Sequence, residues 1–347
     1  MVGAEIDPPL TAQGAGQLVM MHLAVVGISA GAAAALLFAS VTSGTLLSIP
    51  LFYLAPLPIM IAGLGWSHWA ALTAALAGSV ALGIFFGVVF LFAFMVGAGV
   101  PGWWLGYLAM LARPAASAAN APPHQTAFEW YPAGRLVLWA AFLGALVVLV
   151  AIPNFGTDAE SFRTGLRSAL SMILRTQVGS PGNESVDVPG AGKADRLIDF
   201  LVTAIPVAAA VLATITNLLN LWLAARIVKF SGRLARPWPQ LSAMTFPPAI
   251  IAALALAIAL SFVDGLLGIV AGVFSASLLL AYGVLGFAVL HAITAGMNMR
   301  GFVLSLAYAA VIVLGWPLLA LCLLGLFDSI VDLRGQVARK RGPPALS

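Results

Sequence analysis

Two amide side chains, Asn217 and Asn220, lie in an otherwise apolar stretch of the sequence, with Thr214 and Thr216 close by. Residues three positions apart share one face of a helix. A buried amide has to find a hydrogen-bond partner, so this pair would either bond to neighbouring helices or bind a polar ligand. The sequence leaves both roles open and slightly favours the structural one.

A second candidate site is the double proline at Pro56 and Pro58, inside an apolar run. Prolines interrupt a helix and free backbone carbonyls, which in a membrane need internal partners or a water-lined cavity. Broken helices of this kind line substrate sites in many transporters, although a kinked helix packed against its neighbours gives the same pattern. His68 follows, flanked by aromatic residues typical of a membrane interface, and is a third candidate. A small-molecule site would therefore involve Pro56, Pro58, His68, Asn217 and Asn220.

Motifs for enzymatic chemistry are missing from the sequence. There is no P-loop and no H-E-x-x-H metal motif, and the chain has four histidines and one cysteine, Cys322. No Asp or Glu falls in the middle of an apolar run, which disfavours a pump driven by a carboxylate relay. We therefore expect no enzyme, no metal site and no cofactor, and any driving energy would come from other proteins.

The composition sets the class of the elements that must position these residues. Hydrophobic residues make up 62% of the chain and charged residues 8%, against about 25% charged in a typical soluble domain. Apolar runs long enough to cross a bilayer recur along the sequence. These features predict an all-α, polytopic helical membrane protein with about eight or nine transmembrane helices. The apolar segments are 17–40, 46–64, 68–86, 88–112, 134–153, 201–228, 246–263, 265–293 and 302–327. Gly83 and Gly87 predict the join between 68–86 and 88–112, and Pro101 predicts a kink in the second of these.

The domain plan follows from these segments. One feature outside the membrane is an insert, 154–200, in which Thr157 and Glu160 have capping-box spacing and an apolar stripe then predicts an amphipathic helix on the membrane or on a partner. The stripe consists of Phe162, Leu166, Leu170 and Ile173. The regions are an N-terminal tail 1–16, a four-helix N-terminal membrane half 17–112, a loop 113–133, a transmembrane helix 134–153, the insert 154–200, a C-terminal membrane half 201–332 and a basic tail 333–347.

Basic residues indicate the topology. The 226–240 loop contains Arg226, Lys229, Arg233 and Arg236 without an acid and is the strongest cytoplasmic signal. The loop with Arg113 and Arg135 can lie on the same side. We expect a multi-pass protein of the inner (plasma) membrane, with the lipid bilayer and not nucleic acid as its partner. If all nine segments crossed, the basic tail would lie outside. Either one long late segment, 265–299 or 302–333, doubles back, or one of the predicted spans is not a full crossing. Gly315 and Pro317 make the last segment, 302–333, the better candidate.

Small residues recur every four positions on two of the segments. The first stripe contains Gly27, Gly31, Ala35 and Ala39, and the second contains Ala71, Ala75, Ser79 and Gly83. Such stripes let two helices approach closely. They serve either helix packing inside this chain or docking of a separate membrane subunit, and the sequence does not separate the two.

Two resemblances extend these predictions. "GISAGAAAALLF" and "FYLAPLPIMIAGLGWSHWAALTAALAGSVALGIFFG" resemble the start of S components of energy-coupling-factor transporters, over about residues 22–112. This similarity implies an S-component-like core with a T-type membrane subunit and ATPases as partners. S components usually have six spans and short loops, however, and none of their vitamin-binding positions maps onto this chain. Those same N-terminal segments, with "EWYPAGRLVLWAA", "NLWLAARIVKFSGRLARPWPQLSA" and "GLFDSIVDLRG", resemble the uncharacterised YybS-like bacterial membrane family over most of the chain.

Two functional hypotheses follow. The first is a solute-binding or transport-related subunit, energised by separate partners, which binds a small molecule near Pro56, Pro58 and the 68–86 segment. The alternative is a non-transporting membrane scaffold or assembly protein that acts through the 154–200 insert and the basic 226–240 loop.

Overall fold

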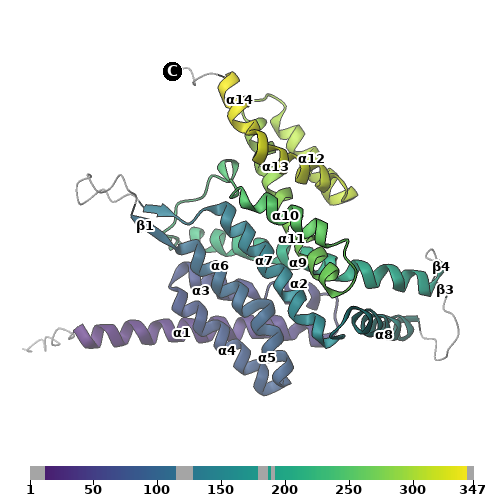
Figure 1. Ribbon diagram of the computed structural model, residues 1–347. Coiled ribbons are helices and arrows are strands. Elements are labelled where there is room, and N and C mark those ends of the chain that lie inside the picture. The colour runs from purple at the N-terminus through teal and green to yellow at the C-terminus, as the bar shows by residue number, and fades with distance from the viewer. Residues whose placement is uncertain (1–11, 115–127, 179–186, 189–191, 342–347) are drawn as a thin grey trace, which may run out of the picture. The chain divides into compact units, whose positions relative to one another are not determined.

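The computed structural model describes residues 12–114, 128–178, 187–188 and 192–341 (Figure 1). Helices dominate these residues, and seven of them are long and apolar enough to cross a membrane. Three further apolar helices are shorter. The chain is thus an all-α, polytopic membrane protein, as its composition predicts. It divides into two compact units, Met1–Trp130 with Leu219–Pro237, and Tyr131–Leu218 with Trp238–Ser347.

Unit 1 is built around α4, which packs against α1, α3, α5 and α6. Gly87 ends α4 with a φ of 94°, a conformation that favours glycine, so the chain turns where Gly83 and Gly87 predict a join. A short hairpin of β1 (Ala112–Pro114) and β2 (Phe128–Trp130) closes this unit. Its helices are α1 (Ala12–Ala39), α2 (Ser48–Tyr53), α3 (Pro56–Gly65), α4 (His68–Phe86), α5 (Val88–Phe94) and α6 (Val100–Met110), together with the part of α9 (Ala194–Phe230) that begins at Leu219.

Two of the spans in unit 1 are interrupted. The segment predicted as 46–64 consists of α2 and α3, separated by Leu54 and Ala55. The segment 88–112 consists of α5 and α6 joined by a π-helical turn, Met95–Gly99. The sequence predicts a kink at Pro101, but the irregular turn comes just before it, and Pro101 sits in the first turn of α6, where its missing N–H is not needed.

Unit 2 is organised by α11, which packs against α7, α10, α13 and the 3-10 turn Leu241–Ala243. Small residues allow close approach, because a Cβ on Gly286 would meet the backbone of Leu321 on α13. The elements of this unit are α7 (Ala133–Ala151), α8 (Ala159–Val178), β3 (Asp187–Val188), β4 (Gly192–Lys193), α9 (Ala194–Phe230) as far as Leu218, α10 (Ala249–Leu260), α11 (Leu266–Ile293), α12 (Arg300–Leu314), α13 (Pro317–Val331) and α14 (Leu333–Arg341).

The insert contains the predicted amphipathic helix, α8, but its cap differs by one residue. Asp158, not Thr157, caps the helix: its carboxylate accepts the backbone N–H groups of Glu160 and Ser161 at 3.0 and 2.9 Å. The hydroxyl of Ser161 also bonds to that carboxylate, and these bonds lower the pKa of Asp158 below its ordinary value. Aspartate accepts these bonds as well as threonine does, so spacing alone could not distinguish the two positions.

The apolar stripe of α8 covers its own chain. Phe162 and Leu166 are buried against Ile152, Val202 and partly buried residues at the start of α11. Ile173 at the far end of the stripe is exposed. Most of the face predicted to lie on the membrane or on a partner is therefore used inside unit 2.

The segment predicted as one span, 302–327, is two helices. Gly315, with a φ of 73°, ends α12, and Pro317 begins α13, which packs against α12 (Figure 1). Each helix has 15 residues, or about 22 Å, less than the roughly 30 Å hydrocarbon core of a bilayer. The Gly315–Pro317 pair therefore creates a turn, and the segment doubles back as the basic tail requires.

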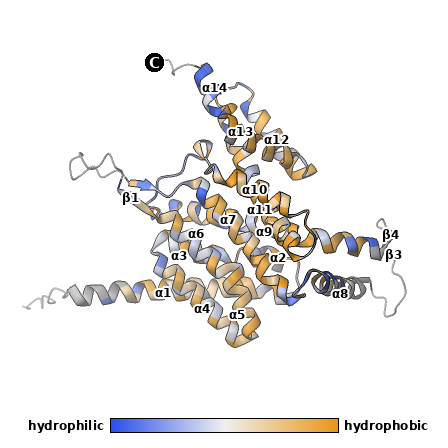
Figure 2. Cartoon of the chain, in the orientation of Figure 1, coloured by the Kyte–Doolittle hydropathy of each residue, from blue (hydrophilic) through white to orange (hydrophobic). Residues whose placement is uncertain are grey.

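Hydropathy follows this arrangement. Figure 2 shows apolar residues along the helices of both units, and hydrophilic residues gathered at α14, α8 and the hairpin of β1. The other helices are therefore suited to lipid along most of their length.

Candidate functional site

The double proline and Asn220 come together in unit 1. Because Pro56 and Pro58 begin α3, Leu57 N–H bonds to Leu54, and the carbonyl of Tyr53 is left without its helical donor. The Nδ2 amide of Asn220 donates to this carbonyl at 2.8 Å. Asn220 is fully buried. The sequence predicts these residues as a substrate site, and the structure shows that one of them supplies the hydrogen bond that the helix break requires.

We expect Asn220→Ala to destabilise the broken span, because the Tyr53 carbonyl would lose its donor in a place that water does not reach. Interhelical hydrogen bonds of this kind contribute about 0.6–1.7 kcal/mol in membrane proteins. Thermal unfolding of the purified protein in detergent measures the loss. The control is Asn217→Ala, whose longer bond predicts a smaller effect, and equal melting temperatures for Asn220→Ala and the wild type would contradict this role.

Asn217 has a similar role in unit 2. Its Nδ2 amide donates to the carbonyl of Ala140 on α7 at 3.3 Å, and its side chain is buried. Beside it, Thr214 packs on Gly144 of α7, where a Cβ would come within 2.3 Å of the threonine hydroxyl oxygen. Both amides of the predicted pair thus bond to backbone carbonyls, and the two residues belong to different units.

His68 lies in an aromatic cluster at the start of α4. Its ring centroid is 4.9 Å from that of Trp69 and 5.3 Å from that of Tyr107 on α6. Ser67 caps the helix by accepting the N–H of Trp69 at 3.1 Å. This position fits an interfacial belt, where rings with polar edges meet the lipid head groups.

The two small-residue stripes meet inside unit 1. A Cβ on Gly27 would lie 2.7 Å from Thr73, and one on Gly31 would lie 2.5 Å from the Ala74 carbonyl. Ala35, Ala71 and Ala75 share the buried cluster at this contact. Gly83 faces α5 instead, where a Cβ would lie 2.8 Å from Leu91. The stripe on α1 therefore packs against α4 and is not available for another subunit.

The basic 226–240 segment is only partly a loop, because α9 continues to Phe230 and its last turns carry Arg226 and Lys229. Several basic side chains of this segment contact other residues of unit 1. Arg236 donates to the carbonyl of Ala109 at the end of α6 at 2.9 Å, and burial lowers its pKa. The guanidinium of Arg233 lies 4.4 Å above the ring of Trp66, and that of Arg226 lies 5.9 Å from Trp222. Lys229 is exposed. The contact of Arg236 brings this loop beside the end of α6, which agrees with both basic loops lying on one side of the membrane.

An apolar cavity lies in unit 2, away from the residues that the sequence singles out. It is a groove of about 720 Å³ between α7, α10 and α11, open along one side. Ligand sites commonly have volumes of about 300–1,000 Å³ and apolar walls with a few polar groups. The groove therefore has the size and character of a ligand site. Its walls include Trp139 and Phe142 of α7, Ile250 and Leu260 of α10, and Leu267, Phe274 and Leu278 of α11.

Small side chains, mainly alanines, leave the space of the groove. Ala141, Ala253, Ala257 and Ala271 line the groove from the three helices, where larger side chains would fill it. Aromatic rings from α7 and α11 also line it, and Phe142 packs against Trp139 and Phe274 with ring centroids 5.6 and 5.8 Å away. The space thus arises from residue size and not from a polar motif.

One charged side chain lines this groove, Arg135 near the start of α7. It is exposed and makes no hydrogen bond or ion pair with any residue that the structure describes. Pro132 precedes α7 without a side-chain cap, so the positive end of the helix dipole is not neutralised by a carboxylate. Tyr131 stands beside it and accepts a bond from Trp139 Nε1 at 3.1 Å. This end of the groove is therefore positive and the remainder is apolar.

A smaller cavity of about 250 Å³ lies between α8, α9 and the turn before α11. Its wall is more polar and includes both Arg163 and Asp264, which are exposed. Charges of both signs on one small cavity give no clear preference for a ligand.

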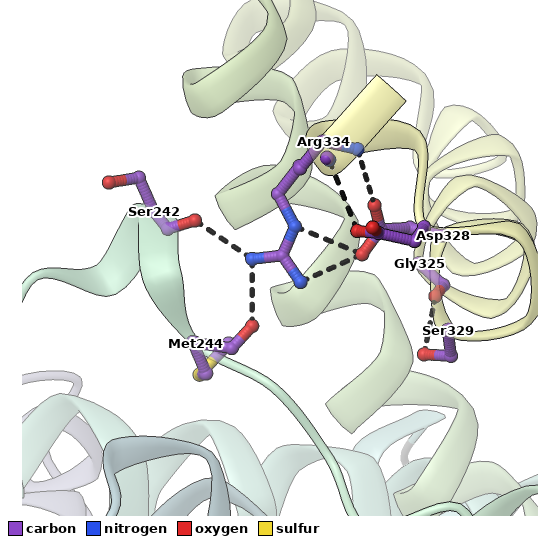
Figure 3. Close-up of polar contacts among 8 residues, drawn as sticks. Ser242, Met244, Gly325, Asp328, Ser329 and Arg334 are labelled. Atoms are coloured by element: carbon purple, nitrogen blue, oxygen red, sulfur yellow. Dashed lines mark hydrogen bonds and ion pairs between the residues drawn. The ribbon is translucent and has the colours of Figure 1, made fainter. Parts of the chain in front are cut away.

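The C-terminal part of unit 2 is held by a buried ion pair. Figure 3 shows Arg334 between Asp328 and two backbone carbonyls. Its Nη2 lies 2.7 Å from Oδ2 of Asp328, and its Nη1 donates to the carbonyls of Ser242 and Met244, both at 2.8 Å. The side chain of Asp328 is 2% exposed. This clamp fixes the start of α14 beside Ser242 and Met244, which precede α10.

The sequence did not reveal the groove or the clamp. Their residues are alanines, aromatic rings and one ordinary ion pair, and none of these types stands out in an apolar chain. The signal that could have found the clamp is "FDSIVDLR", because an aspartate next to an apolar run needs a cation close by.

Comparison with known proteins adds a family but no chemistry. No curated protein and no solved structure matches the chain. The model of one family, described as "Predicted membrane protein (DUF2232)", matches residues 32–329, which include the broken helix, the groove and Asp328. Because this match covers most of the chain, the protein belongs to the DUF2232 family of predicted membrane proteins.

Proposed function

We propose that this protein is a membrane-embedded binding subunit, of the solute-binding or transport-related kind, whose ligand occupies the groove between α7, α10 and α11. The observation that carries this proposal is the groove itself, an open apolar cavity of about 720 Å³ with one cationic side chain at its rim. A site between α7, α10 and α11, three apolar helices, would receive its ligand from the bilayer and not from water.

The double-proline region supports this role less well. The Tyr53 carbonyl is already bonded to Asn220, and Asn217 bonds to Ala140. A ligand there would have to replace these bonds. A ligand in the groove would not have to replace any hydrogen bond, because the walls of this cavity are mostly apolar.

The scaffold hypothesis is less well supported, because much of the surface that would bind partners contacts other residues of this chain. Phe162 and Leu166 of the insert are buried in unit 2, and Arg236 of the basic loop is bonded to the end of α6. Both features were the basis for proposing that the chain recruits partners. Their own structural contacts explain them without a partner.

The energy for transport would come from separate proteins. The sequence has no nucleotide-binding motif, and the apolar runs carry no mid-span carboxylate. A T-type membrane subunit with ATPases is one such partner. Such a partner would dock on a lipid-facing surface other than Gly27 and Gly31, because α4 covers both.

The test is to purify the protein from its host in mild detergent and identify bound small molecules by native mass spectrometry. Ala257→Phe fills the groove from α10 and should reduce bound ligand to background, because the ring takes the space of the ligand. The matched control is Ala259→Phe, on the same helix but outside the groove lining. A ligand that binds both variants equally well, or the recovery of proteins without any small molecule, would contradict the proposal.

A further inference from the structure

We infer that the ligand of the groove is an anionic lipid, with one acyl chain between α10 and α11 and its phosphate at Arg135. This inference rests on the proposed function and specifies its ligand class. It follows from the length of the groove, from the single charge on it and from the side of the membrane on which that charge lies.

The length of the groove matches one leaflet. The lining of α10 runs from Ile250 to Leu260, a rise of about 15 Å along the helix. The lining of α11 runs from Leu267 to Leu278, or about 16 Å. The hydrocarbon core of a bilayer is about 30 Å thick, so this is half of it. A single acyl chain of the adjacent leaflet can fill such a groove without leaving the membrane.

The charge of the groove selects the head group. Arg135 is the charged residue on the wall, and no described residue neutralises it. A guanidinium binds phosphate through two parallel hydrogen bonds, and the uncapped start of α7 adds a favourable dipole. A zwitterionic head group carries its own cation, which Arg135 and the start of α7 would repel. The positive rim therefore favours a lipid with net negative charge.

The position of Arg135 in the chain places this rim at the cytoplasmic surface. It belongs to the first of the two basic connections, which the distribution of Lys and Arg assigns to the inside. α10 begins next to the second connection, and its first turns form the same end of the groove. Anionic lipids give the cytoplasmic leaflet its negative surface potential, so the inferred ligand is present where the groove opens.

The experiment compares two lipids with identical acyl chains, phosphatidylglycerol and phosphatidylcholine, added to delipidated protein and counted by native mass spectrometry. We expect the wild type to retain phosphatidylglycerol about tenfold better, because both lipids offer a phosphate to Arg135 but the choline cation of phosphatidylcholine would lie against the same positive rim. Arg135→Gln should abolish this preference and Arg135→Lys should keep part of it. Arg163→Gln, an exposed arginine outside the groove, is the matched control.

The outcomes separate the two proposals. Equal retention of both lipids by the wild type, with loss in Ala257→Phe, would overturn the anionic-lipid inference and leave the binding role intact. Preference retained in Arg135→Gln would also overturn it. Absence of any lipid or small molecule sensitive to Ala257→Phe would overturn both. Protection of the buried thiol of Cys322 from maleimide verifies that each variant is folded.

Discussion

Replacing Arg334 with methionine is expected to lower the free energy of unfolding by about 3–5 kcal/mol, the usual effect of removing one partner of a buried ion pair. The carboxylate of Asp328 would remain in place, with 2% of its side chain exposed and without a cation. Its second oxygen would keep the backbone N–H of Arg334 at 3.1 Å, which cannot neutralise the charge. The carbonyls of Ser242 and Met244 would also lose their donor.

Two measurements report this loss. Thermal unfolding in detergent gives the change in stability. Maleimide labelling of Cys322, the single cysteine of the chain, reports the contact between α13 and α11, because its thiol is buried and bonds to the carbonyl of Leu279 at 3.0 Å. Arg334→Met should raise the labelling rate and lower the melting temperature together.

The matched control is Arg339→Met. Arg339 lies 3.9 Å from Asp332, and both side chains are about 70% exposed, so their interaction contributes about 0–1 kcal/mol. The double variant Asp328→Leu with Arg334→Met should recover much of the stability, since an apolar pair leaves no unpaired charge. Equal effects of Arg334→Met and Arg339→Met would show that the clamp is not a significant source of stability.

Gly31→Leu is expected to have the second large effect, a destabilisation of about 1–3 kcal/mol or more from overpacking between α1 and α4. A Cβ at this position would lie 2.5 Å from the Ala74 carbonyl and 3.1 Å from the backbone N of Gly78. Backbone atoms of a packed helix cannot move aside as a flexible side chain can. The two helices would have to separate, which would open the cluster that contains Ala35 and Phe38.

Thermal unfolding in detergent and the yield of membrane-inserted protein check this prediction. Gly301→Leu is the control, because it is also a helical glycine but has nothing within 4 Å of a built Cβ. A Gly31→Leu protein that keeps its stability but loses a co-purifying membrane subunit would support docking and contradict the packing role. Loss of stability without any change of partner supports the contact seen in unit 1.

Several parts of the fold followed from the sequence because they depend on local chemistry. Apolar runs, the Gly83–Gly87 join and the apolar stripe of α8 all correspond to helices or turns, since each reflects hydrophobic length, periodicity or a glycine conformation. The conflict over the basic tail was also visible in the sequence. Gly315 and Pro317 marked the segment that resolves it, and the structure shows α12 and α13 as two helices that turn there.

The candidate site was the part that local chemistry could not predict. Asn220 and Pro56 were singled out separately, but only the tertiary structure brought the amide to the carbonyl freed by the helix break, 167 positions away. Facing stripes on α1 and α4 likewise became one packed contact.

The sequence by itself determined the class of this protein, an all-α membrane protein with its basic loops and breaks in place, because hydrophobic length and charge are properties of each segment alone. The tertiary structure decided which buried polar groups have hydrogen-bond partners inside the chain and where the groove lies. A groove formed by Ala141, Ala253, Ala257 and Ala271 arises only when three helices that are distant in sequence meet. Their small side chains then leave space that no single segment encodes.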